Sequence, residues 1–215
     1  MKRSSALVAA VLAFSVSLAA CSKSEESGTP TAAGGGTSGG GTYNCFSDAP
    51  ADAPVTIAVY TSPTRAQTDK HPAETVRDQS KEFAGKVKCE LKLVSPFEQA
   101  DALAAGKAVL AATKQGHGWA MYEYLTDRAG DLDGAAAIEG AAEEGARELG
   151  LDKARFDRDF RDDELAGLVK SNTQKTSQGH PLRRVQVNGA WAPCGSESLD
   201  CLGKYIQGLL EKSSG

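Results

Sequence analysis

The sequence predicts an α/β protein whose central sheet is interrupted by a long, all-helical insertion. Strand-like segments at 55–60 and 87–94 enclose a helical segment at 72–84, and β-branched residues dominate the first of them. Between residues 97 and 178 the apolar residues follow helical spacing alone, and strand signals return only after this block. A run of helices between two sets of strands is typical of a sheet protein that carries a helical insertion.

Length, composition and charge limit the classes of protein to consider. The chain has 215 residues, of which 40% are hydrophobic and 24% charged, which is ordinary for one globular domain with appendages. The formal net charge is −4, and no block of basic residues is present. These values argue against a nucleic acid as the partner.

The N-terminal segment predicts export and a lipid anchor. Lys2 and Arg3 precede an apolar run at 6–19, which has the length of a signal peptide and is short for a membrane span. The run ends in Leu-Ala-Ala-Cys at 18–21, which resembles a bacterial lipobox, where cleavage precedes the cysteine and its sulfur is acylated. We expect residues 1–20 to be the signal peptide and lipid on Cys21 to hold the protein at a membrane. An ordinary signal cleaved before Cys21 is the alternative.

The residues after Cys21 predict a location and a tether. Ser22 follows the cysteine where an inner-membrane lipoprotein would carry Asp. By resemblance to proteobacterial sorting, we therefore expect the periplasmic face of the outer membrane in a bacterial envelope. Residues 21–42 are rich in Gly, Ser and Thr, so we expect a flexible tether before a folded domain at 43–215.

The first half of the domain alternates strands with one helix. Short and longer strands are expected at 43–46 and 55–60, and Ser62-Pro63 ends the second. The helix at 72–84 begins with Pro72, which the first turn of a helix tolerates. In the strand at 87–94, four apolar side chains share one face, since they occupy alternate positions: Val87, Cys89, Leu91 and Leu93.

The second half begins with helices and ends with a hairpin and a further helix. Helices are expected at 102–114, around 119–125, and at 135–149, 152–160 and 162–176. Gly150 is suited to end the third of them. Strands at 182–187 and 190–192 are joined by Asn188-Gly189, a strong two-residue turn signal. The last helix is expected at 197–212, with Ser196 as N-cap.

Four segments, taken in order, resemble one known family. They are ADAPVTI at 51–57, GHGWAMYEYL at 116–125, LGLDKARFDRDF at 149–160 and GHPLRRVQVNG at 179–189. Together they resemble the DsbA-like proteins over about residues 51–210. The resemblance implies a thioredoxin-like fold, with a central mixed sheet and a helical insertion at about 97–178.

The catalytic motif of that family is missing. Members place Cys-x-x-Cys just after the strand that corresponds to 55–60, and here Arg65, Ala66, Gln67 and Thr68 occupy that position. The thiolate is the nucleophile of thiol–disulfide exchange. We therefore expect a non-catalytic module that binds a protein or peptide of the cell envelope, with a purely structural envelope protein as another possibility.

A second loop of the family is represented by Gly179, His180 and Pro181. The resemblance implies that the His180–Pro181 bond is cis and that the loop faces residues 65–68. His180 then either forms local hydrogen bonds or serves as acid, base or ligand.

Arg183 and Arg184 stand where the family prefers apolar residues. One of them could join Arg65 and His180 in a basic pocket suited to a carboxylate or phosphate. Alternatively, both arginines extend toward water or pair with nearby acids.

Ser62 supports an enzymatic alternative. Ser62-Pro63 resembles the Ser-Pro of kappa-class glutathione transferases and related isomerases, in which the serine hydroxyl stabilises a glutathione thiolate. In this chain Ser62 comes earlier after the strand than that pattern requires. A glutathione-dependent enzyme that uses Ser62 is therefore kept only as the second hypothesis. The other enzymatic alternative is an enzyme related to the thiol–disulfide oxidoreductases.

Cysteine usage predicts two disulfides. The chain has five cysteines, and without Cys21 an even number remains, which in an oxidising compartment allows three pairings. The resemblance places the first strand beside the strand at 87–94 and so implies Cys45–Cys89. Cys194 and Cys201 bracket the turn into the last helix and are close enough to pair. The alternative is a relocated redox pair at Cys194 and Cys201.

Metal and cofactor motifs are not found. The three histidines lie far apart, and the sequence contains no His-x-x-x-His, Gly-x-Gly-x-x-Gly or Walker motif. We expect no metal and no cofactor.

Overall fold

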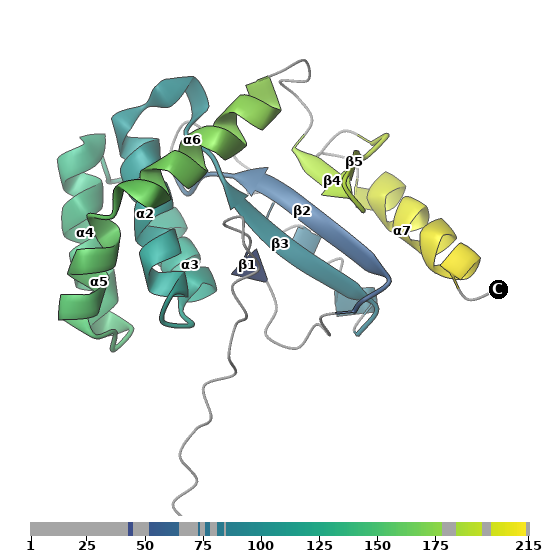
Figure 1. Ribbon diagram of the computed structural model, residues 1–215, viewed down its shortest axis with the longest axis horizontal. Helices are drawn as coiled ribbons and strands as arrows, with labels where there is room; N and C mark the ends of the chain where they lie inside the picture. The colour runs from purple at the N-terminus through teal and green to yellow at the C-terminus, as the bar shows by residue number, and fades with distance from the viewer. Residues whose placement is uncertain are drawn as a thin grey trace, which may run out of the picture. The chain divides into compact units, whose positions relative to one another are not determined.

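A five-stranded mixed sheet lies at the centre of the computed structural model, with strand order β1-β3-β2-β4-β5 (Figure 1). The strands are β1 Tyr43–Asn44, β2 Val55–Thr61, β3 Val87–Leu93, β4 Val185–Val187 and β5 Ala190–Trp191. The structure describes residues 43–44, 52–64, 73, 76–77, 81–83, 85–177, 184–194 and 199–213. All of them belong to one compact unit, Ala32–Gly215.

The two long strands, β2 and β3, lie side by side at the centre of the sheet. β2 and β3 are parallel, with Val55 opposite Val87 and Thr61 opposite Leu93. β1 is antiparallel to β3, and β4 and β5 extend the other side of the sheet in antiparallel pairing. Because β2 and β3 are parallel, their C-terminal ends meet at the same edge of the sheet.

The helices occupy the expected segments. They are η1 Lys81–Phe83, η2 Pro96–Glu98, α2 Ala100–Thr113, α3 Gly118–Arg128, α4 Gly134–Glu148, α5 Lys153–Phe160, α6 Asp163–Ser177 and α7 Leu199–Ser213. Figure 1 shows α2 to α5 grouped towards the left of the view and α7 towards the right. Of the helix expected at 72–84, residues 73, 76 and 77 are helical and 81–83 form a 3₁₀ turn; the others lie outside the described residues.

The predicted face of β3 is confirmed, because its residues alternate between buried and half-buried positions. One face of β2 and the buried face of β3 belong to one core with Ala73, Val76, Leu202 and Ile206. This core continues into the insertion, where α2 packs against α3, α4, α5 and α6. α2 is rich in alanine, and most of its residues are buried, so it serves as the central helix of the insertion.

The hairpin turn is also confirmed. Asn188 and Gly189 have φ angles of 49° and 80°, as a two-residue type I′ turn requires. Asn188 Oδ1 accepts a hydrogen bond of 2.7 Å from the Thr56 N–H, and the Asn188 N–H donates to the Thr56 carbonyl at 2.8 Å. The side chain of the turn therefore fastens the hairpin to β2.

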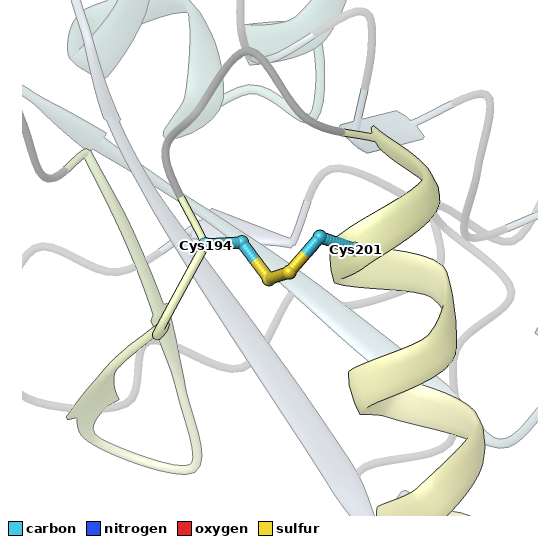
Figure 2. Close-up of a disulfide and its surroundings, with 2 residues drawn as sticks. All are labelled: Cys194 and Cys201. Atoms are coloured by element: carbon cyan, nitrogen blue, oxygen red, sulfur yellow. A yellow bond between two sulfur atoms is a disulfide. The ribbon is translucent and has the colours of Figure 1, made fainter.

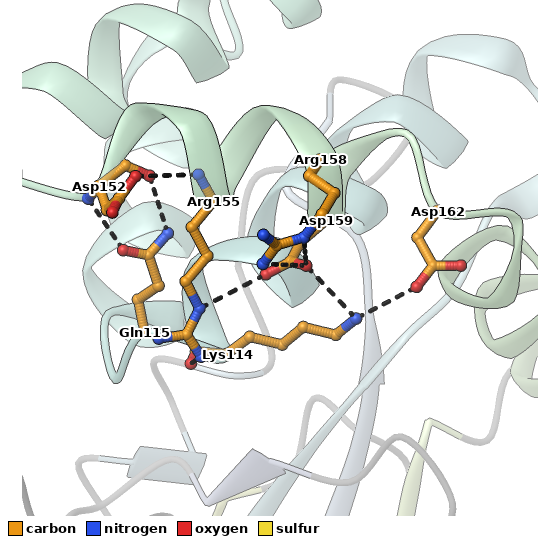
Figure 3. A network of polar contacts seen from close by, with 7 residues as sticks. All are labelled: Lys114, Gln115, Asp152, Arg155, Arg158, Asp159 and Asp162. Atoms are coloured by element: carbon orange, nitrogen blue, oxygen red, sulfur yellow. Dashed lines mark hydrogen bonds and ion pairs between the residues drawn. The ribbon is translucent and has the colours of Figure 1, made fainter.

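A polar network joins the end of α2 to α5 and α6 (Figure 3). The Asp152 carboxylate caps α5 by accepting from the Arg155 N–H at 2.9 Å. Asp159, which is 8% exposed, lies 3.3 Å from an Arg158 guanidinium nitrogen, 3.7 Å from Arg155 Nε and 4.0 Å from Lys114 Nζ. Lys114 Nζ also contacts Asp162 Oδ2 at 3.2 Å. A buried carboxylate is thus surrounded by three cationic side chains.

Three boundaries differ from the sequence prediction. β4 begins at Val185 and not at 182, so Arg184 precedes the strand, and Arg183 lies outside the described residues. β3 ends at Leu93, because the chain turns at Ser95 and Pro96. The helical insertion begins with η2 at 96–98, where Phe97 has a left-handed conformation, and α2 starts at Ala100, before the predicted start at 102.

Candidate functional site

The candidate site lies where β2 ends, at the edge that it shares with β3. β2 ends at Thr61, and Thr61, Ser62 and Thr64 are all buried. Ser62 Oγ and Thr64 Oγ1 share a hydrogen bond of 3.1 Å. Arg65, Ala66, Gln67 and Thr68, which stand at the degenerate motif, lie outside the described residues. The described part of the site therefore presents hydroxyl groups that are buried and already bonded to each other.

This arrangement bears directly on Ser62 as a candidate nucleophile or thiolate ligand. Its side chain is fully buried, and its hydroxyl is engaged with Thr64. To reach Ser62 Oγ, a ligand sulfur would have to displace the atoms that bury this side chain and break its hydrogen bond with Thr64. The described geometry therefore gives no support to the glutathione-dependent alternative.

Tyr122 of α3 forms the wall of the site. Its side chain is fully buried, and its hydroxyl lies 3.1 Å from Thr61 Oγ1. The Trp119 ring stacks on Tyr122, with centroids 5.2 Å apart and planes inclined by 28°. The helical insertion is thus attached to the end of β2 by an aromatic pair and one hydroxyl contact.

Arg77, from the helical residues before β3, packs against the same aromatic pair. The Arg77 guanidinium lies over the Trp119 ring at 4.8 Å from its centroid and forms an ion pair with Glu123. Sequence reasoning missed this group, since it predicted only a helix around 119–125. The helical spacing of Trp119 and Tyr122 was the available signal, but nothing in the sequence indicated Arg77 as their partner.

Arg184 is the one described member of the predicted basic pocket. Its carbonyl accepts a hydrogen bond of 2.8 Å from the Tyr60 N–H, which holds it beside the end of β2. Burial lowers the pKa of its guanidinium, and the Tyr122 hydroxyl acts in the opposite direction. Arg184 and Tyr122 are therefore brought together, whereas Gly179, His180, Pro181 and the expected cis bond lie outside the described residues.

On the face of β3 opposite its buried apolar side chains, Lys88, Glu90 and Lys92 form a row of ion pairs. Glu90 pairs with Lys88 at 3.0 Å and with Lys92 at 3.3 Å. Tyr60 packs on Trp191, with ring centroids 5.3 Å apart, and donates to Gln186 Oε1 at 3.1 Å. Burial raises the pKa of Tyr60, and Glu90 adds to that rise. Burial lowers the pKa of Lys92, although Glu90 opposes it.

The described cysteines are oxidised. Cys194 and Cys201 are joined by a disulfide, with Cα atoms 5.8 Å apart (Figure 2), which is the pairing expected from their separation. It connects the segment after β5 to the first turn of α7. Cys89 is also disulfide-bonded; Cys45, its expected partner, lies outside the described residues, as does the lipidation site Cys21.

Neither a membrane-spanning helix nor a metal-binding cluster is found among the described residues. No helix among them is long and apolar enough to cross a membrane. Within the same residues, no group of three or more His, Cys, Asp or Glu side chains is placed to hold a metal ion.

Comparison with known proteins finds similarity at the level of structure. No family model matches the chain, and no curated protein matches it. BdbD from Bacillus subtilis, in its oxidised form, superposes with a TM-score of 0.58 and 18% identity, covering 76% of this chain and 91% of that one. The oxidoreductase DsbA from Xylella fastidiosa superposes with a TM-score of 0.56 and 14% identity, covering 81% and 96%.

A third similar structure is a thioredoxin-like oxidoreductase from Silicibacter pomeroyi. Its TM-score is 0.51 and its identity 18%, over 74% of this chain and 86% of that one. These similarities confirm the predicted fold class. The chain has a thioredoxin-like fold with a helical insertion, structurally similar at low identity to the DsbA-like oxidoreductases.

Proposed function

We propose that this protein is a lipid-anchored binding module of the bacterial cell envelope that uses the DsbA-like fold without its redox chemistry. The observation that carries the proposal is the chemistry at the end of β2. Residues 61–68 contain no cysteine, and the hydroxyls of Ser62 and Thr64 are buried and bonded to each other. A thiol–disulfide reaction needs an accessible thiolate, so binding is the function that these residues support.

The disposition of the cysteines supports the same proposal. Cys194 and Cys201 tie the segment after β5 to α7, and Cys89 is buried in the core. These positions support a structural role for each of the three cysteines. The lipid on Cys21 and the envelope location remain part of the proposal and follow from the lipobox. Replacing residues 1–21 by a signal peptide that is cleaved without lipidation should move the protein from the membrane fraction to the soluble fraction of the envelope.

A restored motif tests whether the missing thiols are what separates this protein from an oxidoreductase. We expect the unchanged protein to contain no free thiol and not to accelerate the reduction of insulin by dithiothreitol. The double variant R65C/T68C regenerates Cys-x-x-Cys at the degenerate position, and it should accelerate insulin reduction. Activity in the unchanged protein that disappears in C194S/C201S would overturn the proposal and identify the second pair as a relocated redox centre.

The binding half of the proposal needs a separate test. A photo-crosslinking amino acid at Gln67 should capture a discrete envelope protein or peptide in living cells. The same residue at Glu139, which is exposed on α4, serves as the control and should capture nothing discrete. Equal capture at the two positions would contradict a binding site at the end of β2.

A further inference from the structure

Phe97 is an exposed aromatic residue in the segment between β3 and α2. Its side chain is 91% exposed, and it is the large hydrophobic residue singled out by exposure in the described part of the chain. A phenylalanine in water forgoes the favourable free energy of burial. One exposed apolar side chain is common on protein surfaces, so its meaning depends on the backbone that holds it.

That backbone is strained. Phe97 has φ 55° and ψ 25°, and Glu98 also has φ 55°. The left-handed region is unfavourable for residues with a side chain, most of all for bulky ones. Among the described residues, the other non-glycine with positive φ is Asn188, a residue type that tolerates this conformation. Two successive strained residues without a glycine indicate that the turn has a function which outweighs its cost.

The turn is also fastened on both sides. The Glu98 N–H donates to the Ser95 carbonyl at 3.1 Å, and the Gln99 N–H donates to the Pro96 carbonyl at 3.2 Å. Ser95 Oγ donates to the Gln99 carbonyl at 2.8 Å, and the Ser95 N–H donates to Thr173 Oγ1 of α6 at 2.9 Å. Phe97 is therefore presented by a rigid turn, and little conformational entropy is lost when such a ring is bound.

The position of the turn relates it to the candidate site. The Val94 N–H donates to the Thr61 carbonyl at 3.0 Å, which joins the segment before Phe97 to the last residue of β2. The turn and the buried hydroxyls of Ser62 and Thr64 therefore lie at the same edge of the sheet. Ligands of open α/β sheets bind outside the carboxyl ends of the strands.

We propose that Phe97 is the anchor of a protein–protein contact and fills an apolar pocket of a partner protein whose rim is basic. The charge on the turn's own segment argues for this rim. Glu98 is exposed and Asp101 is partly exposed, and the sequence contains no Lys or Arg between Lys92 and Lys107. An anionic membrane surface attracts basic residues, so a protein with complementary charge suits this turn better than a lipid surface. The contact does not require the binding proposed around residues 65–68.

Crosslinking followed by titration tests the proposal. In cells that produce the full chain, benzoylphenylalanine at position 97 should capture one discrete protein that the same residue at Glu139 does not capture. That protein, once purified, is titrated against the unchanged chain, Phe97→Asn and Glu98→Lys. Phe97→Asn should weaken binding by about 30-fold or more, as expected for a hot-spot residue. Glu98→Lys should weaken it less, by about 3–10-fold at low salt, with the effect reduced at high salt.

Stability separates loss of the anchor from loss of the fold. Asparagine tolerates left-handed φ, so Phe97→Asn should keep or raise Tm, by up to about 2–4 °C. Binding lost together with a lowered Tm would overturn the proposal. So would crosslinking of position 97 to a second copy of the chain, sedimentation with anionic vesicles that depends on Phe97, or equal affinity of Phe97→Asn and the unchanged chain.

Discussion

Gly145 of α4 lies so close to α3 that a methyl group has no room there. A Cβ at this position would come within 2.8 and 2.9 Å of two ring carbons of Tyr124 and 3.2 Å of Met121 Sδ. Neither neighbour can easily move. Met121 is fully buried, Tyr124 is 8% exposed, and the Arg128 guanidinium covers the Tyr124 ring at 3.7 Å from its centroid. Gly145→Ala should therefore overpack the interface between the two helices.

Gly140 in the same helix provides the matched control. A Cβ there meets nothing within 4 Å, so Gly140→Ala gains only the better helix propensity of alanine, about 0.5–1 kcal/mol. Gly145→Ala gains the same amount and pays about 1–3 kcal/mol for overpacking. The two variants should thus differ by about 1–3 kcal/mol in the free energy of unfolding, with Gly145→Ala the less stable.

Urea denaturation followed by circular dichroism measures this difference. The midpoint should move in opposite directions for the two variants, or move up for Gly140→Ala and stay unchanged for Gly145→Ala, while the m-value remains constant. Equal stabilisation by both substitutions would refute the close packing of α3 on α4. A changed m-value in Gly145→Ala would show instead that the insertion no longer folds as one unit with the sheet.

Three further predictions concern the candidate site, the dependence of stability on pH in acid, and the disulfide. Tyr122→Phe leaves Thr61 Oγ1 buried without this partner, and we expect a loss of about 1–3 kcal/mol in thermal unfolding; no change would mean that the contact is not formed. The Glu164 N–H and Lys114 hold the pKa of Asp162 below its ordinary value. A carboxyl group whose pKa is lower in the folded state stabilises the fold above its unfolded pKa of about 3.9, and this contribution is lost as the pH falls through the folded pKa. Asp162→Asn should therefore reduce the loss of stability below about pH 4. An unaltered dependence of stability on pH in this range would contradict the assignment. The double variant C194S/C201S removes a short loop closure and should lower the free energy of unfolding by about 2–3 kcal/mol, whereas an unchanged urea midpoint would show that α7 does not depend on this bond.

Local patterns were enough to predict most of the elements. The alternation of Val87, Cys89, Leu91 and Leu93 predicted the buried face of β3, because a strand directs successive side chains to opposite faces. Asn188-Gly189 predicted the hairpin, and Gly150, with φ 68°, ends α4 as expected. In each case the decisive interaction lies within a few residues of the chain, so the sequence alone contains it.

The candidate site depended on contacts between distant segments. Arg77 meets Trp119 and Glu123, and no spacing rule connects these positions. The Phe97 turn shows the same limit more sharply. Ser95-Pro96 signalled the end of β3, yet the left-handed conformation that follows is fastened by Thr173 of α6, far along the chain. Tertiary hydrogen bonds override the local preference of Phe97, so the sequence, which predicted a first helix at 102–114, did not indicate the strained turn before it.

The carboxyl ends of β2 and β3 present different side chains at the same edge of the sheet. At β2 the hydroxyls of Ser62 and Thr64 bond to each other, which leaves no free nucleophile among the described residues of that segment. After β3 the backbone of Phe97 has an unfavourable left-handed conformation, and its side chain is exposed to water. Catalysis needs a reacting atom, whereas recognition needs a rigid and complementary surface. The binding function that we propose rests on this combination of buried hydroxyls and an exposed aromatic side chain at one edge of the sheet.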